Sequence, residues 1–335
     1  MKTLLIPAAE MQETFLNILL RQGYTNDRAE QLASVFTQNS IDGIYTHGLN
    51  RFPRFIEYTQ KGYVQRDAVP ELKFKNNGIE QWDGNLGPGI LNALHATDQS
   101  MKLADDYGIG CVGLRNTNHW MRGGTYGWKA SSEEYIFIAF TNTIANMPAY
   151  GAKDARLGNN PLVLGAPYGD SAVVLDMAMS QYSYGSMELA AMQGRDLPEF
   201  GGYDTKGNVT KDPKEILASG RPLPVGYWKG AGLSLLLDVL TTLLSGGLST
   251  HEITQQPAEY GLSQVFISIK VPSPGSALPI ANIVENIIRD YKQSIPANSK
   301  SDITYPGERV LRARKKNQEY GIPVLEEIWN KIQRL

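Results

Sequence analysis

Apolar residues return every three or four positions near the start of the chain, which is the spacing of an amphipathic helix. The first such helix is predicted between Pro7 and Gly23, since proline favours the first position of a helix. A second helix is predicted from Asp27, where Glu30 three residues later completes a capping-box pattern. Pro53 predicts the start of a third helix.

The pattern changes from about residue 110 to residue 270, where short apolar runs alternate with turns rich in glycine and asparagine. Such runs are typical of β-strands. They fall at 136–140, 162–166, 172–177 and 265–269. A segment with two prolines, 272–278, predicts a boundary, after which helices return. The last helix is predicted to start at Pro323.

These patterns predict an α/β protein in which helices from both termini surround a central body with a mixed sheet. A chain of 335 residues has room for one or two domains. We place a helical domain at 1–113 plus 285–335, and an α/β domain at 114–284.

Composition narrows the choice of partners. A hydrophobic content of 42% and a charged content of 20% are ordinary for a globular protein, and a net charge of −2 offers no basic field to a nucleic acid. The longest apolar run, 233–244, contains Asp238 and is too short to span a membrane, and Pro7 and Glu10 interrupt the apolar start of the chain. A cytoplasmic protein without a membrane or nucleic-acid partner is predicted. Cys111 is the only cysteine, which excludes an intramolecular disulfide and a cysteine-based metal cluster.

His47 and Arg51 are the most informative pair, because about one helical turn separates them and both can point into the same space. An imidazole can give or take a proton at neutral pH, and a guanidinium can hold a carboxylate in one orientation. The pair therefore suits a reaction at a carbon next to a carboxylate. The alternative is that both are surface side chains around the helix start at Pro53.

Two glycine-rich segments match anion-binding patterns to different degrees. The segment 108–113 fits the dinucleotide-binding pattern, but a helix is predicted before it and a strand after it, the reverse of the required order. The segment 224–232 leads into the apolar run 233–244, so its backbone amides and Lys229 can bind an anion while Trp228 offers a flat face. The alternative there is a glycine-rich helix start without a ligand.

The other histidines give weaker indications. His119 lies among asparagines and glycines after a predicted strand, which suits polar recognition; a structural histidine is the alternative. His251 and Glu252 begin like a zinc-protease helix but lack a second histidine four residues on, so no metal site is predicted.

Four segments in this order carry a resemblance to a known family: 46–55, 79–83, 118–124 and 226–230. Over nearly the whole chain, the sequence resembles the malate/L-lactate dehydrogenase-like family of NAD(P)-dependent oxidoreductases, which do not use a Rossmann fold. The resemblance implies a mixed-sheet, non-Rossmann NAD-binding body at 114–284 and a helical substrate domain formed from both termini. It also implies a homodimer with the site near the subunit interface.

The resemblance implies roles for single residues as well. His47 corresponds to the catalytic proton donor, Arg51 to the contact with the substrate carboxylate, and His119 to a segment that approaches substrate and nicotinamide. Two positions depart from the family pattern, Thr46 in place of serine and Asn159 in place of threonine. The implied cofactor contacts are Ala172, Val173, Val174, Leu175, Asp176, Met177 and Ala178, then Trp228 and Lys229, and finally Gly307, Glu308 and Arg309.

The expected reaction is reduction of a 2-keto acid by NADH, with a polyhydroxylated keto acid as substrate, His47 giving the proton and no metal taking part. Asp176, if it reaches the adenosine ribose, would favour NADH by repelling a 2′-phosphate. A malate- or lactate-type 2-hydroxy-acid dehydrogenase is the alternative within this class. Two further alternatives are a non-redox lyase or isomerase, in which His47 removes a proton next to a carboxylate, and a ligand-binding relative without activity.

Overall fold

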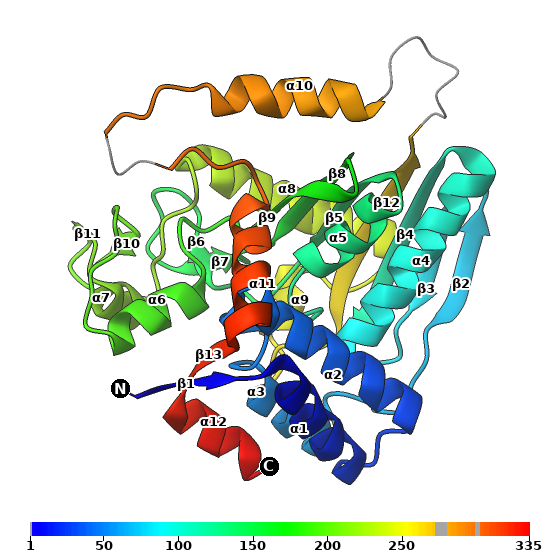
Figure 1. The fold of residues 1–335 in the computed structure, drawn as a ribbon, viewed down its shortest axis with the longest axis horizontal. Coiled ribbons are helices and arrows are strands. Elements are labelled where there is room, and N and C mark those ends of the chain that lie inside the picture. The colour runs from blue at the N-terminus through cyan, green and yellow to red at the C-terminus, as the bar shows by residue number, and fades with distance from the viewer. Residues whose placement is uncertain (1, 272–279, 299–301) are drawn as a thin grey trace.

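A seven-stranded mixed sheet forms the centre of the computed structural model, which describes residues 2–271, 280–298 and 302–335 (Figure 1). β3 and β4 run parallel, and the other neighbouring strands run antiparallel. In spatial order the strands are β2 (Glu71–Asn76), β3 (Ile79–Asp83), β4 (Ile109–Thr117), β12 (Leu262–Lys270), β5 (Tyr135–Thr141), β8 (Leu162–Tyr168) and β9 (Ser171–Met177). The sheet confirms the predicted α/β class, and β5, β8, β9 and β12 confirm the four predicted strands.

Helices cover both faces of this sheet. α4 (Gly89–Tyr107) and α5 (Gly124–Ser132) pack on one face, where Phe137 and Phe266 are fully buried. α8 (Trp228–Ser245) packs on the other face, against β12, β4 and β5.

The glycines at 108–113 join α4 to β4. Gly108 ends the helix with a φ of +82°, a conformation that glycine adopts without a steric cost, and β4 starts at the next residue. A helix that precedes the strand cannot point its N-terminus at a pyrophosphate, so these glycines do not form a dinucleotide-binding turn.

Segments from both ends of the chain form a second apolar core, in the lower half of Figure 1. β1 and β13 pair antiparallel, which joins the two ends. Phe52 stacks on Phe15 at 4.2 Å between ring centroids and meets Phe36 edge-on at 5.0 Å. The elements of this core are β1 (Thr3–Ile6), α1 (Ala8–Arg21), α2 (Asn26–Ile41), α3 (Phe52–Gln60), β13 (Ile322–Leu325) and α12 (Glu326–Gln333).

Two predicted helix starts are wrong. Pro323 lies in β13 and α12 begins at Glu326; proline is tolerated there because each strand of a two-stranded sheet is an edge strand. α2 begins at Asn26, so Asp27 falls inside the first turn. There its carboxylate accepts a hydrogen bond from Gln31 and does not cap the helix.

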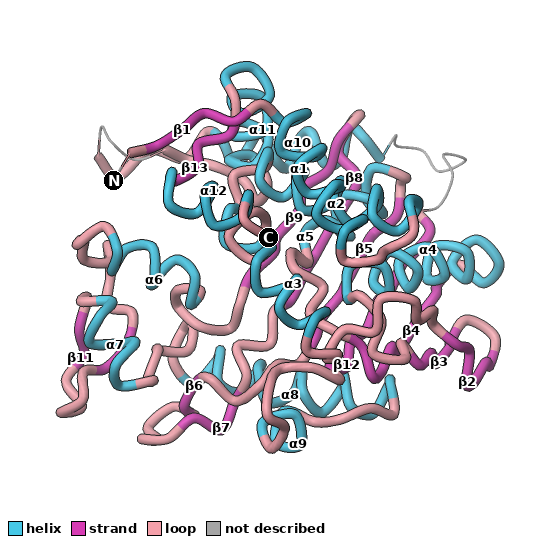
Figure 2. The backbone as a smooth tube through the Cα atoms, turned by 90° about the horizontal axis from the view of Figure 1, so that it is seen from below, coloured by secondary structure: helices cyan, strands magenta, loops and turns pink. Residues whose placement is uncertain are grey.

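A small lobe lies to one side of the sheet, at the left of Figure 1. Figure 2 shows α6 and α7 of this lobe on the opposite side of the molecule from α4 and β2. The lobe contains α6 (Tyr184–Met192), β10 (Gly202–Tyr203), β11 (Val209–Thr210) and α7 (Pro213–Ser219). The remaining elements are the 3-10 helix η1 (Tyr45–His47), β6 (Met147–Pro148), β7 (Ala155–Leu157), α9 (Thr250–Thr254), α10 (Ile280–Lys292) and α11 (Glu308–Tyr320).

The division into two domains stays a prediction. β4 crosses the predicted boundary between 113 and 114, so residues from both sides contribute to one sheet. The predicted boundary segment 272–278 lies outside the described residues. Among the helices that the structure describes, none combines the length and the apolar character needed to cross a bilayer.

Candidate active site

Two adjoining cavities of about 830 and 800 Å³ meet beside His47 and His119. The first cavity follows β9 and the segment before α11, and the second extends towards α3, α6 and α12. The residues that border both cavities mark their junction: Thr46, His47, His119, Thr143, Asn159, Ser183 and Leu189.

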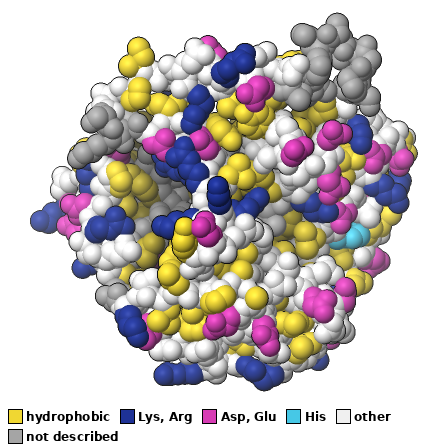
Figure 3. All heavy atoms as spheres, in the orientation of Figure 1, with side chains coloured by type: hydrophobic (Ala, Val, Ile, Leu, Met, Phe, Trp, Pro, Cys, Tyr) yellow, Lys and Arg dark blue, Asp and Glu magenta, His cyan; other side chains and the backbone are white. Residues whose placement is uncertain are grey.

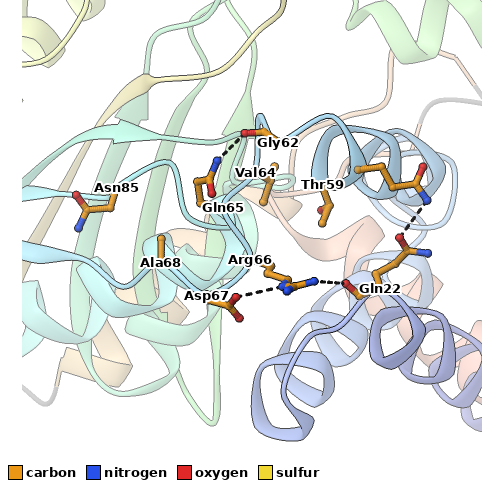
Figure 4. A pocket seen from close by; sticks show the side chains of 10 residues that line it. Gln22, Thr59, Gly62, Val64, Gln65, Arg66, Asp67, Ala68 and Asn85 are labelled. Carbon is orange, nitrogen blue, oxygen red and sulfur yellow. Dashed lines mark hydrogen bonds and ion pairs between the residues drawn. The ribbon is translucent and has the colours of Figure 1, made fainter.

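A third cavity, of about 720 Å³, lies away from the histidines, between the end of α1 and the segment after α3 (Figure 4). Its charged side chains are bonded to protein groups, since Arg66 donates to Asp67 and to the Gln22 carbonyl. It contains no group that titrates near neutral pH, so the candidate active site is the pair of cavities at the histidines.

His47 is held at the junction by the end of α2. The following residue must be glycine, because a Cβ on Gly48 would come within 2.3 Å of the Ser40 hydroxyl. That hydroxyl accepts the Leu49 N–H at 3.0 Å. The Thr46 hydroxyl lies 3.0 Å from His47 Nδ1, which fixes the ring and leaves Nε2 for a ligand.

The environment of His47 disfavours its charged form. Burial, followed by the positive charges of Arg51 and Arg122, lowers its pKa from 6.5 to about 4. His47 is therefore neutral at pH 7, and negative charge placed nearby would raise its pKa.

His119 lies against His47, with ring centroids 5.8 Å apart and planes 23° from parallel. Its Nδ1 accepts the Met121 N–H at 2.9 Å, so the neutral ring carries its proton on Nε2. Burial and the charges of Arg51 and His47 hold the pKa of His119 well below 6.5. This arrangement makes His119 a hydrogen-bond donor in the site.

Arg51 precedes α3 and borders the second cavity. Its guanidinium donates to Glu259 at 3.3 Å, and among the described residues it makes no other hydrogen bond. Four N–H groups of a largely buried guanidinium are thus available to an anion. Glu259 was not predicted as a site residue, because it lies 208 positions from Arg51 and belongs to no recognisable motif.

One wall of the first cavity comes from β9, the strand that was predicted to contact a cofactor. Val174, Leu175, Asp176 and Ala178 line it from β9 and the residue that follows. Asp176 accepts the Gly124 N–H at 2.8 Å, and burial raises the pKa of its carboxyl group.

The segment before α11 completes this wall. The Val174 N–H donates to the Pro306 carbonyl at 3.2 Å, which joins the segment to β9. Gly307 has a φ of +94°, and a Cβ there would come within 3.0 Å of the Trp128 ring. Gly307 and Arg309 both border the cavity, so glycine lets the chain pass closely beside it.

Several predicted cofactor residues do not border this cavity. Ala172 is buried in the sheet core, and neither Val173 nor Met177 borders the cavity. Glu308 forms ion pairs with Lys292 and Arg312. Trp228 and Lys229 lie at the N-terminus of α8 outside both cavities, and Trp228 is 67% exposed.

Asn159 is a further polar group at the junction. Its side-chain carbonyl accepts hydrogen bonds from Thr143 at 3.2 Å and from Asn146 at 3.1 Å. The carbonyl is thus occupied by protein, and the amide N–H₂ remains for a ligand. The sequence marked Asn159 as a departure from the family pattern but gave no sign of Thr143 or Asn146.

Two features mark the surface of the molecule. Figure 3 shows Lys and Arg side chains gathered around a hollow near the middle of one face, where α11 runs in Figure 1; Arg309, Lys315 and Lys316 of α11 are exposed. α8 exposes a wide apolar face made by Trp228, Leu235, Leu236, Val239, Leu240 and Leu243.

In the described part of the chain, no group of three or more His, Cys, Asp or Glu side chains is arranged to hold a metal ion.

Comparison with known proteins gives consistent matches. Residues 6–333 match the family model described as malate/L-lactate dehydrogenase. A 2,3-diketo-L-gulonate reductase from Citrobacter koseri is 42% identical over 327 residues, which covers 97% of this chain and 98% of that protein. Among solved structures, malate dehydrogenase from Entamoeba histolytica superposes with a TM-score of 0.93 at 24% identity, over 99% of this chain and 97% of the other. Sulfolactate dehydrogenase from Methanocaldococcus jannaschii superposes with a TM-score of 0.88 at 26% identity, over 98% and 95% of the two chains.

Proposed function

The chain belongs to the malate/L-lactate dehydrogenase family and is therefore an oxidoreductase, and on this premise we propose that it uses NADH to reduce the ketone of a 2-keto acid. We propose 2,3-diketo-L-gulonate as the substrate and 3-keto-L-gulonate as the product, in line with the name of the Citrobacter koseri relative. One observation carries the proposal: the Arg51 guanidinium, which uses one N–H group in its ion pair with Glu259, borders the second cavity together with His47 and His119 and acts on the pKa of both histidines.

Substrate binding begins at Arg51. Its free N–H groups can hold both oxygens of the substrate carboxylate, while Glu259 keeps the guanidinium in place through a single bond. The neighbouring carbonyl then lies at the junction, within reach of His47 and His119. The second cavity, of about 800 Å³, has room for a chain of six carbons with several hydroxyl groups.

The substrate anion also prepares His47 for proton donation. One of the two cations that lower the pKa of His47 is Arg51, so a carboxylate bound there raises that pKa towards neutrality. When bound, a dihydronicotinamide supplies the hydride to the carbonyl carbon. His47 gives its proton to the carbonyl oxygen, and the His119 Nε2–H donates a hydrogen bond to the same oxygen as negative charge develops.

The cofactor is proposed to be NADH. The β9 wall, the closely packed Gly307 and the Asp176 carboxylate fit a nucleotide cofactor. If Asp176 contacts the ribose, it repels the 2′-phosphate of NADPH. Equal kcat/KM values for NADH and NADPH would contradict this assignment.

We also propose a homodimer. An apolar face as wide as that of α8 is typical of an interface between subunits. Trp228 and Lys229 lie at one end of this face, so they can reach a cofactor only if it is bound near the interface, where a second copy contributes to the site. A cytoplasmic location stays a prediction, which cell fractionation would test.

A panel of acids assayed for loss of NADH absorbance tests the proposed function. The panel contains 2,3-diketo-L-gulonate, pyruvate, oxaloacetate, and the amide of pyruvate. A higher kcat/KM for the diketo acid than for the other acids is expected. Preference for oxaloacetate or pyruvate would favour the malate- or lactate-type alternative, and NADH binding without turnover would favour a ligand-binding relative.

A further inference from the structure

Asp42 lies at a buried meeting point of three segments that border the cavities. Only 2% of the residue is exposed, and it comes directly after α2, five positions before His47. It accepts hydrogen bonds from Arg122, which is 4% exposed and follows His119 in the chain, and from Gln38 at 2.7 Å. Arg314 of α11 binds both of its oxygens, at 2.7 and 3.0 Å.

Arg122 and Arg314, which bind Asp42, each contact or border part of the site. Arg122 belongs to the loop that carries His119, and it borders the first cavity itself. Arg314 lies two helical turns after Gly307 and stacks on Trp128 at 5.0 Å, the same ring against which Gly307 packs. Asn317, on the next turn of α11, donates to the Ile41 carbonyl at 2.9 Å. One carboxylate therefore connects the His47 segment, the His119 loop and the cofactor-side helix.

We propose that Asp42 is a positioning residue that holds the proton donor, the second histidine and the cofactor wall in one geometry and sets the charge beside His47. This inference rests on the proposed function. Burial alone would raise the pKa of Asp42, but hydrogen bonds from Arg314 and the charges of both arginines lower it, so Asp42 remains ionised. The group of one carboxylate and two guanidiniums carries a net charge of +1.

The net charge of +1 on Asp42, Arg122 and Arg314 affects the pKa of His47. The charged or titratable groups that border the two cavities with His47 are Arg51, Arg54, Glu57, His119, Arg122, Asp176, Glu188, Glu259, Arg309 and Lys331, with the tyrosines Tyr45, Tyr184, Tyr291 and Tyr305. Among these, Arg51 and Arg122 lower the pKa of His47. Asp42 compensates Arg122, and Arg314 in turn compensates Asp42.

Two substitutions change the charge in opposite directions. Asp42→Asn raises the net charge of the group by one, so it should lower the pH at which the reduction rate falls by half. Arg314→Met lowers the net charge by one and should raise that pH. Each shift is expected to be roughly half a pH unit, because one unit charge changes beside Arg122 in a partly solvated site.

The experiment compares these variants with Lys316→Met, which removes an exposed positive charge from the same helix. Affinity for NADH is measured by fluorescence titration, without turnover, and the pH dependence of kcat is measured with the diketo acid. Both Asp42→Asn and Arg314→Met should weaken NADH binding about tenfold and lower kcat roughly tenfold, because small displacements of positioned groups have large effects. Lys316→Met should match the wild type in both measurements.

The outcomes are distinguishable. Variants that melt at lower temperature but keep the wild-type NADH affinity and pH midpoint would show that Asp42 only stabilises the fold. If Asp42→Asn does not fold, Arg314→Met, whose side chain is 28% exposed, still tests the inference: an unchanged pH midpoint and NADH affinity overturn it. Failure of the wild type to reduce any acid of the panel counts against the proposed function, while equal NADH affinities in the binding titration count against the role of Asp42.

Discussion

Replacement of Arg51 by lysine is the sharpest test of the proposed substrate class. Lysine keeps the positive charge but loses the planar fork that can hold two carboxylate oxygens while a further N–H holds Glu259. A single ammonium group on a flexible chain must serve both carboxylates, so the substrate loses at least one charge-assisted hydrogen bond and its fixed orientation.

The expected loss is about 2–4 kcal/mol of transition-state stabilisation, as for truncated charge pairs that are shielded from solvent. Shielding applies here because the Arg51 and Glu259 side chains are only 24% and 13% exposed. The loss corresponds to a decrease in kcat/KM of roughly 30- to 900-fold. Both kcat and KM should change, because a misoriented carbonyl no longer faces His47.

The assay measures kcat and KM of the wild type and Arg51→Lys on a 2-keto acid and on its amide. Arg66→Lys is the control, since Arg66 is an exposed arginine beside the cavity far from the histidines. The wild type should prefer the acid, and Arg51→Lys should lose most of that preference. A variant that loses both substrates equally, or one that melts at a lower temperature with unchanged kinetics, would refute the carboxylate contact.

Three further results are expected. His47→Ala should lower turnover by about a hundredfold to ten-thousandfold with NADH binding nearly unchanged. A loss below about tenfold would indicate that His119 is the proton donor. The folded protein resists protonation of His47 down to about pH 4, whereas the unfolded chain binds that proton near pH 6.5. His47 therefore lowers the free energy of unfolding as pH falls through this range. Chemical denaturation at several pH values should show a smaller fall in the free energy of unfolding for His47→Gln than for the wild type. The same fall in both proteins would contradict the lowered pKa of His47. Leu236→Glu on the exposed face of α8 should shift the protein towards monomers in sedimentation, and an unchanged mass would place the dimer interface elsewhere.

The sequence predicted the parts of the site that lie close together in the chain. His47 and Arg51 were paired because one turn separates them, and the strand at 172–177 was visible as an apolar run between turns. Pro323 misled because proline marks edge strands as well as helix starts, and only the pairing with β1 decides between them.

The rest of the site depends on contacts between distant segments. Glu259 binds Arg51 from a distant loop. Asp42 forms ion pairs with Arg122, in the loop before α5, and with Arg314 of α11. Local periodicity contains no information about such pairs. Trp228 and Lys229 were assigned to the cofactor from their glycine-rich helix start and from the resemblance, and within one subunit they lie outside the cavities.

The pairing of β1 with β13 has a consequence for how the protein is made. On the ribosome, α1 and α2 emerge long before the strand that joins them to the other end of the chain. The core that buries their apolar faces is complete only after Ile322 and Trp329 have been synthesised. Contacts of such long sequence separation slow folding and leave apolar surface exposed in the nascent chain. Slow, chaperone-dependent maturation is therefore expected, with the site becoming functional only after nearly all of the chain has been synthesised.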